Sequence, residues 1–379
     1  MDFITKRGKI WSMFETRVKS LKQKIKKEGL DAVLISSVSN IIYFTGFDGF
    51  FKEERDGYLL VTKDKAFVLT HSIYSTVLKN LLKEFEVIEV SRRDPASKVI
   101  ARLLKNQSAK LGIEEHDLKV TEYKSLQKKI KELKAFSLNL RTIKNNQEIN
   151  LIKRACEIGD FAFKKIIKKI KEGISEKELA LKLEYLIKSK GADLSFKTII
   201  AFGKNSSAPH HVTSSAKLEK GQIILMDFGV KHENYCSDMT RTVFFGNPSE
   251  KQIKIYETVL EAQNKAINFI NLSIKNGKSI KAAEVDKMAR DYILSKGYPS
   301  IPHSLGHGIG LDVHENPHLS PKSKEVLKEG MVFSIEPGIY IPGFGGVRIE
   351  DLYVFERGGL KQITTSPKNL IKLHRLRYN

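Results

Sequence analysis

The sequence predicts two domains, an α/β domain over residues 1–140 and an α+β domain over residues 141–379. Three observations predict this fold class. The chain has 379 residues, which exceeds the roughly 100 to 200 residues of an ordinary domain. Strand and helix patterns alternate along its first third, as is typical of an α/β unit. The later part instead carries pairs of long helices between groups of strands.

The first domain opens with an amphipathic helix over about 10–29, since apolar residues recur at helical spacing and Gly29 provides a stop. The run AVLIS at 32–36 predicts a buried strand. GYLLVTKDKAFVLT predicts a hairpin over 57–70 that turns at Lys63 to Lys65. The other elements of this domain alternate in type: a helix near 73–84, a strand at 86–90, a helix near 96–105, a strand at 109–114 and a helix at 121–132.

The second domain follows a segment at about 133–150 that we interpret as the connection between the domains. QIILMDFGVK and NYCSDMTRTVFFG predict an antiparallel pair, because residues 232–234 offer turn chemistry between two β-rich runs. The final runs MVFSIEPGIYI and GVRIEDLYVFE each predict a strand. The expected helices of this domain lie near 147–171, 175–191 (with Ser175 as N-cap), 249–276 and 280–296.

Composition limits the kind of partner and the compartment. The formal charge of +21 raises the question of an anionic partner, but most basic residues are lysines interleaved with acidic residues along amphipathic helices. We therefore expect a solvated surface, with neither nucleic acid nor a membrane as partner. Two distant cysteines, Cys156 and Cys236, favour a reducing compartment. The N-terminal segment lacks the apolar core of a signal peptide, so we expect a cytoplasmic protein.

Side chains of the types that bind metals are concentrated between Pro302 and Asp351, in the segments HSLGHGIGLDVHENP, SIEPGIY and VRIED. Upstream, the segment ILMDFGVKHENYCSDMTRT adds two aspartates, which are also ligand-type side chains. Together these segments hold the following candidates: Asp227, Asp238, His303, His307, His314, Glu336, Arg348 and Glu350. Any one of these carboxylates alone is more often a salt-bridge partner or strand-end residue than a ligand, and it is their combination that indicates a site.

Burying these carboxylates on strands costs free energy unless each is paired with another charged group or bound to a metal. Side chains alternate between the faces of a strand, so Asp227 points away from the face shared by Met226 and Phe228. A buried carboxylate is costly unless it is paired or bound to a metal. Several carboxylates close together would repel one another, and a pair of divalent cations removes that repulsion. We also expect the Gly-rich HSLGHGIG to turn tightly and to bring His303 and His307 toward the carboxylates.

One imidazole and four carboxylates favour hard or borderline ions. We expect two divalent metal ions per chain, with Mn²⁺ favoured and Co²⁺, Zn²⁺ or Fe²⁺ compatible. Two such ions can lower the pKa of a shared water molecule and polarise a carbonyl oxygen, which is hydrolysis chemistry. Arg348 lies two residues from Glu350, which places a fixed cation beside the cluster.

The spacing of these motifs resembles that of a known family. DFG is followed by SDMTRT, then HSLGHGIGLDVHE, EPGIY and VRIED, as in the metallopeptidase family of prolidase, aminopeptidase P and methionine aminopeptidase, which has the pita-bread fold. That resemblance covers about 145–379. The first domain, with SNIIYFTGF, resembles the creatinase-type N-terminal domain. The resemblance therefore implies a creatinase-like domain over 1–140 and an α+β pita-bread catalytic domain over 141–379.

The resemblance also implies roles for single residues. It implies five ligands of a dinuclear centre, of which Asp238 and Glu350 bridge both ions: Asp227, Asp238, His307, Glu336 and Glu350. It implies substrate contacts from four side chains of one pocket: His210, His303, His314 and Arg348. It implies catalytic roles for His210, His314, Glu336 and Arg348, with Glu336 moving the proton of the attacking water. His211, next to His210, is the weaker candidate for a substrate contact.

By the same resemblance we expect a homodimeric peptidase whose substrate has proline at its second position, either an Xaa-Pro dipeptide or a longer peptide. An Xaa-Pro bond has no N–H, so specificity should come from a pocket shaped for the ring. Two alternatives remain open. One is another aminopeptidase of the family, such as the methionine aminopeptidase type, and the other is a pita-bread protein that binds partners without catalysis.

Overall fold

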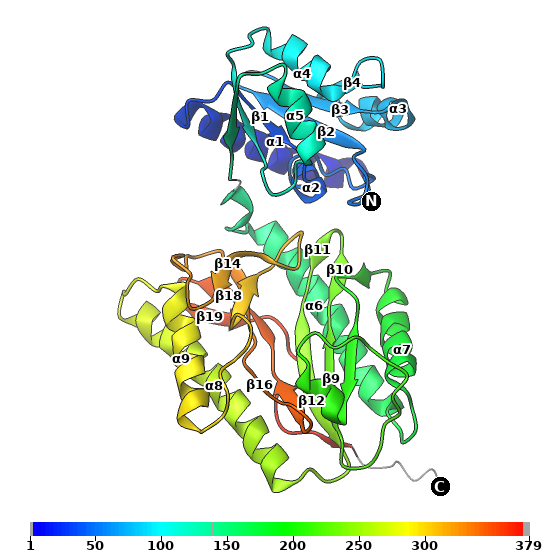
Figure 1. The fold of residues 1–379 in the computed structure, drawn as a ribbon, viewed down its shortest axis with the longest axis vertical. Coiled ribbons are helices and arrows are strands. Elements are labelled where there is room, and N and C mark those ends of the chain that lie inside the picture. The colour runs from blue at the N-terminus through cyan, green and yellow to red at the C-terminus, as the bar shows by residue number, and fades with distance from the viewer. Residues whose placement is uncertain (1–2, 138, 374–379) are drawn as a thin grey trace. The chain divides into compact units, whose positions relative to one another are not determined.

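The computed structural model describes residues 3–137 and 139–373. The chain divides into two compact units, residues 1–140 and 141–379, and each is described by itself (Figure 1). Helices of the first unit are α1 (Phe3–Lys27), α2 (Val38–Thr45), α3 (Ser72–Leu81), α4 (Ala96–Leu104) and α5 (Val120–Gln127). Its strands are β1 (Ala32–Ile35), β2 (Gly57–Thr62), β3 (Ala66–Thr70), β4 (Glu86–Glu89), β5 (Lys110–Ile113) and β6 (Glu132–Ala135).

The first unit is built on a six-stranded sheet in the order β4-β3-β2-β1-β5-β6. β1, β2 and β3 pair antiparallel, and β2 and β3 form the predicted hairpin. β4, β5 and β6 join the sheet through parallel pairs, which require crossover connections such as α3, α4 and α5. Apolar side chains from α4 and α5 pack on one face of the sheet. The α/β pattern expected for this part of the chain is confirmed.

Two elements of this unit were not predicted. All eight residues of α2 are buried, so the helix has no polar face that could show a helical period in the sequence. It ends at Gly46, whose φ of 72° suits the left-handed C-terminal position. β6 lies in the segment expected to connect the domains, and instead pairs with β5 as an edge strand. The expected connection therefore begins inside β6, and its last residues lie in helix α6 (Asn146–Ile166).

The second unit contains four long helices and most of the strands. Its helices are α6 (Asn146–Ile166), α7 (Glu176–Lys188), α8 (Glu250–Lys275) and α9 (Ala282–Ser295), with the 3-10 helices η2 (Ile167–Lys169) and η3 (Gly203–Ser207) at short turns. The 3-10 helix η1 (Asn139–Arg141) includes the last residues of the first unit and the first residue of the second. The first strands of the second unit are β7 (Asp193–Leu194), β8 (Ile199–Phe202), β9 (Ile223–Phe228), β10 (Val230–His232), β11 (Tyr235–Cys236) and β12 (Met239–Phe245). The later strands are β13 (Gly306–Gly308), β14 (Glu315–Leu319), β15 (Val332–Ile335), β16 (Gly338–Ile341), β17 (Gly345–Arg348), β18 (Asp351–Glu356), β19 (Gly359–Gln362) and β20 (Lys372–Leu373).

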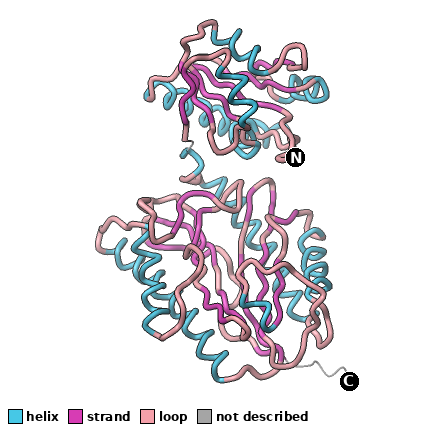
Figure 2. The backbone as a smooth tube through the Cα atoms, viewed as in Figure 1, coloured by secondary structure: helices cyan, strands magenta, loops and turns pink. Residues whose placement is uncertain are grey.

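The strands of the second unit lie between two layers of helices. Its larger sheets have the orders β20-β12-β9-β8 and β14-β13-β15-β18-β19. Figure 1 shows α6 and α7 on one side of the strands and α8 and α9 on the other, and Figure 2 shows the strands in the middle of this unit. One apolar cluster joins α6 and α7 to β8, β9 and β12, and another joins α8 and α9 to β15, β17 and β18. Polar side chains between the two clusters are thus held by rigid elements.

Helices α6, α7 and α8 begin where the sequence provides capping residues. The side chains of Asn145, Ser175 and Ser249 each accept a hydrogen bond from the backbone N–H three residues later. The side chain of the Glu or Gln at that later position accepts a hydrogen bond from the backbone N–H of the capping residue. Each such capping box satisfies N–H groups that the helix leaves free, and a cap of this kind stabilises by about 1 kcal/mol.

The two strands predicted at the end of the chain are each interrupted. The run at 331–341 forms β15 and β16, with Glu336 and Pro337 between them. The run at 346–356 forms β17 and β18, with Ile349 and Glu350 between them. Proline at 337 cannot donate to a strand ladder, which explains the first break. The prediction of continuous strands was wrong, and both breaks fall at candidate ligands.

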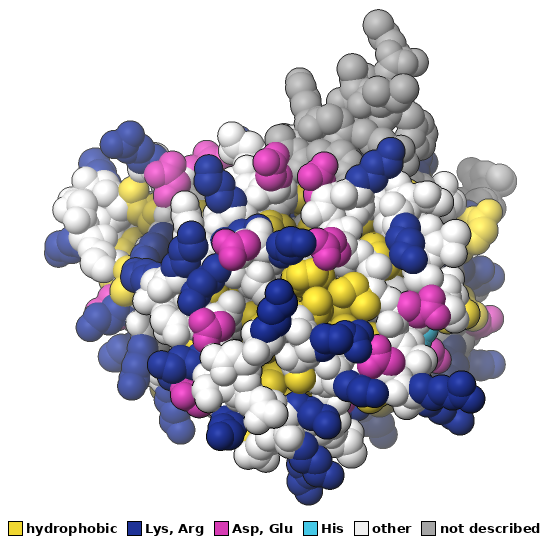
Figure 3. Space-filling model, turned by 90° about the horizontal axis from the view of Figure 1, so that it is seen from above, with side chains coloured by type: hydrophobic (Ala, Val, Ile, Leu, Met, Phe, Trp, Pro, Cys, Tyr) yellow, Lys and Arg dark blue, Asp and Glu magenta, His cyan; other side chains and the backbone are white. Residues whose placement is uncertain are grey.

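Surface charge is dispersed on the face seen in Figure 3. Lys and Arg side chains of the described residues are scattered there, with acidic side chains between them. This arrangement is consistent with the solvated lysine-rich surface expected from the sequence. In the part of the chain that the structure describes, no helix combines the length and the apolar character needed to span a bilayer. Cys156 and Cys236 are both buried.

Candidate active site

All nine candidate site residues line one cavity of about 420 Å³ in the second unit. They come from five separate stretches of the chain. The residues are His210, Asp227, Asp238, His303, His307, His314, Glu336, Arg348 and Glu350. Lys197 and His318, which were not singled out in the sequence, line the same cavity.

Strand alternation delivers Asp227 to the cavity as predicted. Met226 and Phe228 belong to the apolar cluster under α6 and α7, so the side chain between them points to the opposite face of β9. Asp238 stands just before β12, which pairs antiparallel with β9 so that Thr240 lies opposite Asp227. The hairpin turn between β10 and β11 places Asn234 at a φ of 71°, a value that Asn tolerates better than most residues.

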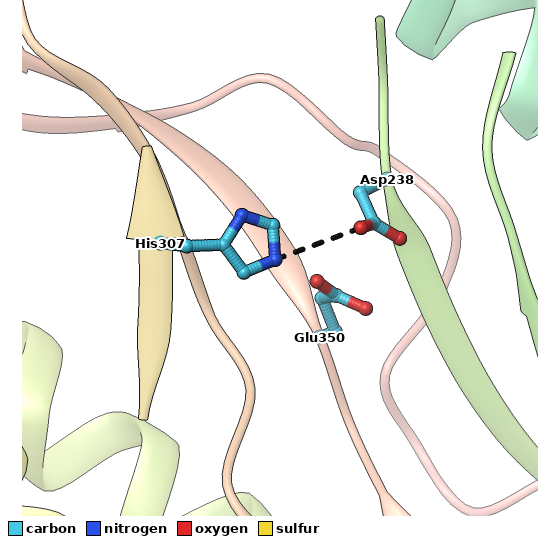
Figure 4. A group of neighbouring side chains, drawn as sticks. All are labelled: Asp238, His307 and Glu350. Carbon is cyan, nitrogen blue, oxygen red and sulfur yellow. Dashed lines mark ion pairs between the residues drawn. The ribbon is translucent and has the colours of Figure 1, made fainter. Parts of the chain in front are cut away.

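Three of the candidates that line the cavity form a compact group (Figure 4). Ligand atoms of Asp238, His307 and Glu350 all lie within 4.8 Å of one another. Nε2 of His307 is 3.7 Å from Oδ2 of Asp238 and 3.3 Å from Oε1 of Glu336. Nδ1 of the same ring contacts the backbone oxygen of Gly308 at 3.1 Å. This contact leaves Nε2 directed at the carboxylates, as in metal-binding histidines.

Glycines bring the His307 strand close to its neighbours. A Cβ on Gly306 would collide with the backbone oxygen of Ser334, and one on Gly308 with that of Asn316. Neither glycine has a positive φ. The expectation that the Gly-rich segment turns tightly was therefore wrong here, because these glycines permit close packing of β13 between β14 and β15.

Buried carboxylate oxygens in this group have no partner. Among the described residues, Oδ1 of Asp227, Oδ1 of Asp238 and Oε1 of Glu350 are buried without a hydrogen bond. Unpaired buried charge is costly, and bound cations would compensate it. The donor set of one imidazole and several carboxylates therefore fits divalent metal ions.

Electrostatics lead to the same conclusion. Burial and the neighbouring carboxylates raise the pKa of Asp238 and of Glu336 well above their usual range, and raise that of Glu350 to about 8. Burial and the nearby His314 lower the pKa of His307 to about 4, which keeps the imidazole neutral as metal binding requires. Without cations the carboxylates would take up protons, and with cations they can remain ionised.

A second layer of polar groups holds these ligands in place. Thr240 Oγ1 donates to Oε2 of Glu350 at 2.8 Å, and Arg348 Nε donates to Thr240 Oγ1 at 2.9 Å. Arg348 also pairs with Oδ2 of Asp227 and donates to the Tyr340 hydroxyl. The arginine is therefore fully engaged with its neighbours, so its main visible action is to fix the orientation of the acidic side chains.

The candidate substrate histidines differ in whether their ring nitrogens already have hydrogen-bond partners. In the described part of the chain, the ring nitrogens of His210 and His314 have no hydrogen-bond partner, and the His314 ring lies 4.4 Å from that of His307. His303 uses both ring nitrogens, one with Tyr340 Oη at 2.8 Å and one with Ser304 O at 2.8 Å. His211, the weaker candidate, is bound to Glu176 at 2.8 Å. His210 and His314 thus have nitrogens to offer a substrate.

Glu176 is a buried residue that the sequence analysis missed. It stands at the start of α7, where a glutamate looks like an ordinary helix-dipole partner. Its carboxylate accepts hydrogen bonds of 2.6–2.8 Å from five donors at the end of β8 and on the following segment, which carries His210: Phe202 N, Asn205 Nδ2, His211 Nε2, Ser214 N and Ser214 Oγ. Burial raises the pKa of Glu176, but the bonds from Ser214, Asn205 and His211 outweigh it and lower the pKa below its usual value.

Replacing Glu176 with Gln should reduce the free energy of unfolding at pH 7 by about 1–3 kcal/mol, because the amide turns one acceptor into a donor that faces other donors. A carboxylate with a lowered pKa stabilises above its unfolded-state pKa, and this stabilisation is lost as the pH falls through the folded-state value. The difference between the variant and the natural chain in urea unfolding should therefore be full at pH 7 and shrink below pH 4.5. Glu172→Gln, at an exposed position, is the control; equal losses in both variants would contradict the anchoring role.

Comparison with known proteins identifies the family. The profile of metallopeptidase family M24 matches residues 150–357. This chain belongs to metallopeptidase family M24. The profile of the creatinase/prolidase N-terminal domain matches residues 17–143. Both matches confirm the resemblance noted in the sequence and the expected fold class, a creatinase-like domain followed by a pita-bread catalytic domain.

Relatives of this M24 chain match over nearly their full length. It is 41% identical to a Xaa-Pro dipeptidase of Pyrococcus horikoshii, over 94% of this chain and 98% of the relative. The structure of a prolidase from Thermococcus sibiricus is 36% identical with a TM-score of 0.87, covering 95% of this chain and 99% of that one. An X-Pro aminopeptidase structure from Thermotoga maritima is 34% identical with a TM-score of 0.78, covering 91% and 98%.

Family membership settles the class of chemistry. The M24 chain is a metallopeptidase, hence a hydrolase that depends on divalent metal ions. The cavity supplies side chains of the kind that such ions need, and its unpaired oxygens fit them.

Proposed function

We propose that this M24 chain hydrolyses the Xaa-Pro bond, either in dipeptides or at the N-terminus of peptides with proline at the second position. One observation carries the proposal: nine side chains with metal-binding and substrate-binding chemistry line a single cavity. The cavity belongs to a chain that is 41% identical to a Xaa-Pro dipeptidase over 94% of its length. The names of the other relatives, prolidase and X-Pro aminopeptidase, support the same bond.

In this proposal five side chains hold two divalent ions per chain: Asp227, Asp238, His307, Glu336 and Glu350. Asp238 and Glu350 would be shared between the ions, as their place in the compact group with His307 allows. Mn²⁺ is the favoured ion, and Co²⁺, Zn²⁺ and Fe²⁺ suit the same donors. When bound, the ions supply an activated water molecule and an electrophile for the carbonyl oxygen.

The chain's own groups manage the proton and the substrate. Glu336 accepts the proton of the attacking water and returns it to the proline nitrogen, which has no proton of its own. Ser334 orients this carboxylate through a bond of 3.2 Å. His314 and His210 donate to the carbonyl oxygen as negative charge develops there. Arg348 pairs with Asp227 and fixes its orientation, and His303 acts on the substrate pocket through Tyr340.

Further properties belong to the same proposal. We infer a homodimer, a cytoplasmic location and no nucleic-acid or membrane partner, supported by the kinship with prolidases, the buried cysteines and the dispersed surface charge. The domain division at residue 140 would leave all nine site residues in the second domain. The methionine aminopeptidase type and a binding-only protein are not favoured, since the N-terminal profile is that of creatinase and prolidase and every ligand position is filled.

Peptide hydrolysis with defined ions tests the proposal. The full chain should cleave Ala-Pro or Ala-Pro-Ala-Ala with added Mn²⁺ or Co²⁺, lose that activity on chelation and regain it when the ion is restored. Met-Ala-Ala serves as the comparison peptide and should be cleaved far more slowly. Preferential release of methionine, or Xaa-Pro cleavage that survives complete chelation, would overturn the proposal.

A further inference from the structure

Among the described residues that line the cavity, one permanently charged cationic side chain makes no ion pair or hydrogen bond with the others. Lys and Arg keep their charge at neutral pH, and the cavity is lined by two of them, Lys197 and Arg348. Arg348 is engaged with Asp227, Thr240 and Tyr340. In the part of the chain that the structure describes, the Lys197 ammonium has no ion pair or hydrogen bond, and the residue is exposed. It is therefore available to a ligand.

The backbone around Lys197 is fastened to the strands of the metal-binding group. Ser195 N donates to Gly229 O at 3.1 Å, and Ser195 Oγ donates to Ser237 O at 2.9 Å. These two acceptors stand next to the segments that carry Asp227 and Asp238. The segment holding the lysine is thus positioned relative to the ligands, while its long side chain can still adjust.

The spacing between Lys197 and Ile199, the residue opposite Asp227, matches the length of a dipeptide. Ile199 lies opposite Asp227 in the pairing of β8 with β9, and both Ile199 and Lys197 line the cavity. Lys197 is two residues before Ile199, and two residues of extended chain span at most about 7 Å. A dipeptide whose scissile carbonyl lies at the carboxylate group would reach that far with its second residue.

A dipeptide that ends in proline carries a carboxylate on that second residue, whereas a longer peptide has a neutral amide there. In the proposed centre the four carboxylates offset the charge of the two divalent ions, so a substrate carboxylate needs a separate cation, and Lys197 supplies one. We propose that Lys197 binds the C-terminal carboxylate of Xaa-Pro dipeptides and thereby makes them the preferred substrates. This inference rests on the proposed function and adds the substrate class that the proposal leaves open.

Removal of this charge should alter substrate binding and leave the chemical step intact. The carboxylate is remote from the breaking bond, so its interaction with Lys197 is the same in the ground state and in the transition state. Loss of such an interaction raises KM and leaves kcat nearly unchanged. For a partly exposed charged pair we expect KM for Ala-Pro to rise about fivefold to tenfold.

The test uses the full chain loaded with Mn²⁺ and the variant Lys197→Met. Ala-Pro is compared with its C-terminal amide and with Ala-Pro-Ala-Ala. The natural chain should prefer the free acid about fivefold to tenfold in kcat/KM, and Lys197→Met should remove that preference. Lys197→Arg should keep it. The control Lys204→Met removes the same charge from an exposed lysine of η3 that does not line the cavity, and it should behave as the natural chain.

A second readout does not depend on turnover. The reduced-amide analogue of Ala-Pro cannot be hydrolysed, and calorimetry should show weaker binding to Lys197→Met than to the natural chain, with no such difference for the analogue's C-terminal amide. If Xaa-Pro peptides are cleaved but Lys197→Met keeps the preference for the free acid, the inference is wrong and the proposed function stands. If no Xaa-Pro peptide is cleaved, the proposed function fails, and equal binding of the analogue by both proteins would then overturn the inference as well.

Discussion

Replacing Asp238 with Ala is expected to lower Xaa-Pro turnover at least about 1000-fold and to remove bound metal. Asp238 lies within 4.8 Å of ligand atoms of both His307 and Glu350, and in the proposed centre it joins the two ions. Its loss therefore takes away a donor from each ion, and with the ions go the activated water and the electrophile, each of which contributes several kcal/mol. The measurements are kcat/KM for Ala-Pro and metal content per chain after dialysis.

His314→Gln is the matched control for this variant. His314 lines the same cavity and its ring contacts that of His307, but it stands outside the proposed ligand set. This variant should keep its metal and lose about 10- to 1000-fold in kcat, since it removes a donor to the developing oxyanion. Two ions per chain in Asp238→Ala would contradict the bridging role, and metal loss in His314→Gln would show that the ligand set is misassigned.

Replacing Arg241 with Met is expected to lower the free energy of unfolding by about 3–5 kcal/mol. The side chain is 1% exposed and pairs with Asp351, which is fully buried. It also donates to Glu350 O at 2.6 Å and to Ser366 O at 2.7 Å. Methionine fills similar space but leaves the carboxylate of Asp351 and three backbone oxygens, those of Thr240, Glu350 and Ser366, short of donors. The desolvated charge of Asp351 is the main source of the loss.

Thermal and denaturant unfolding measure the effect of Arg241→Met, with a fall in Tm on the order of 10 °C for a unit of this size. Arg154→Met is the control, because Arg154 forms an exposed pair with Glu157 and such pairs contribute about 0–1 kcal/mol. Adding Asp351→Asn to Arg241→Met should recover part of the loss, since the buried charge is then gone. A change within about 1 kcal/mol in Arg241→Met alone would contradict this role.

Much of the site could be predicted because its residues conflict with their surroundings. A carboxylate between Met226 and Phe228 contradicts a buried apolar strand, and such a conflict points to function rather than to packing. Histidines next to glycines in HSLGHGIG carry the same signal. The nine residues singled out on this basis and by resemblance line one cavity, although the roles given to them remain proposals.

Other features of the structure had no comparable signal in the sequence. Glu176 and Lys197 occur in sequence contexts where Glu and Lys are ordinary surface residues, and only the folded loop and cavity show what they face. α2 is buried on all sides, so periodicity could not reveal it. The break at Glu336 could have been read from Pro337, which cannot donate to a strand ladder. The break at Glu350 arises because β16 and β17 form a separate two-stranded sheet, a tertiary arrangement that residue propensity does not encode.

The central claim is that five side chains hold a pair of ions that prepares water for attack on an Xaa-Pro bond. Crystals of the full chain grown with Mn²⁺ and measured at the manganese absorption edge test it most directly. The account predicts two anomalous peaks about 3.5–4 Å apart, within reach of Asp227, Asp238, His307, Glu336 and Glu350. A single peak, or peaks away from Asp238 and Glu350, would contradict it.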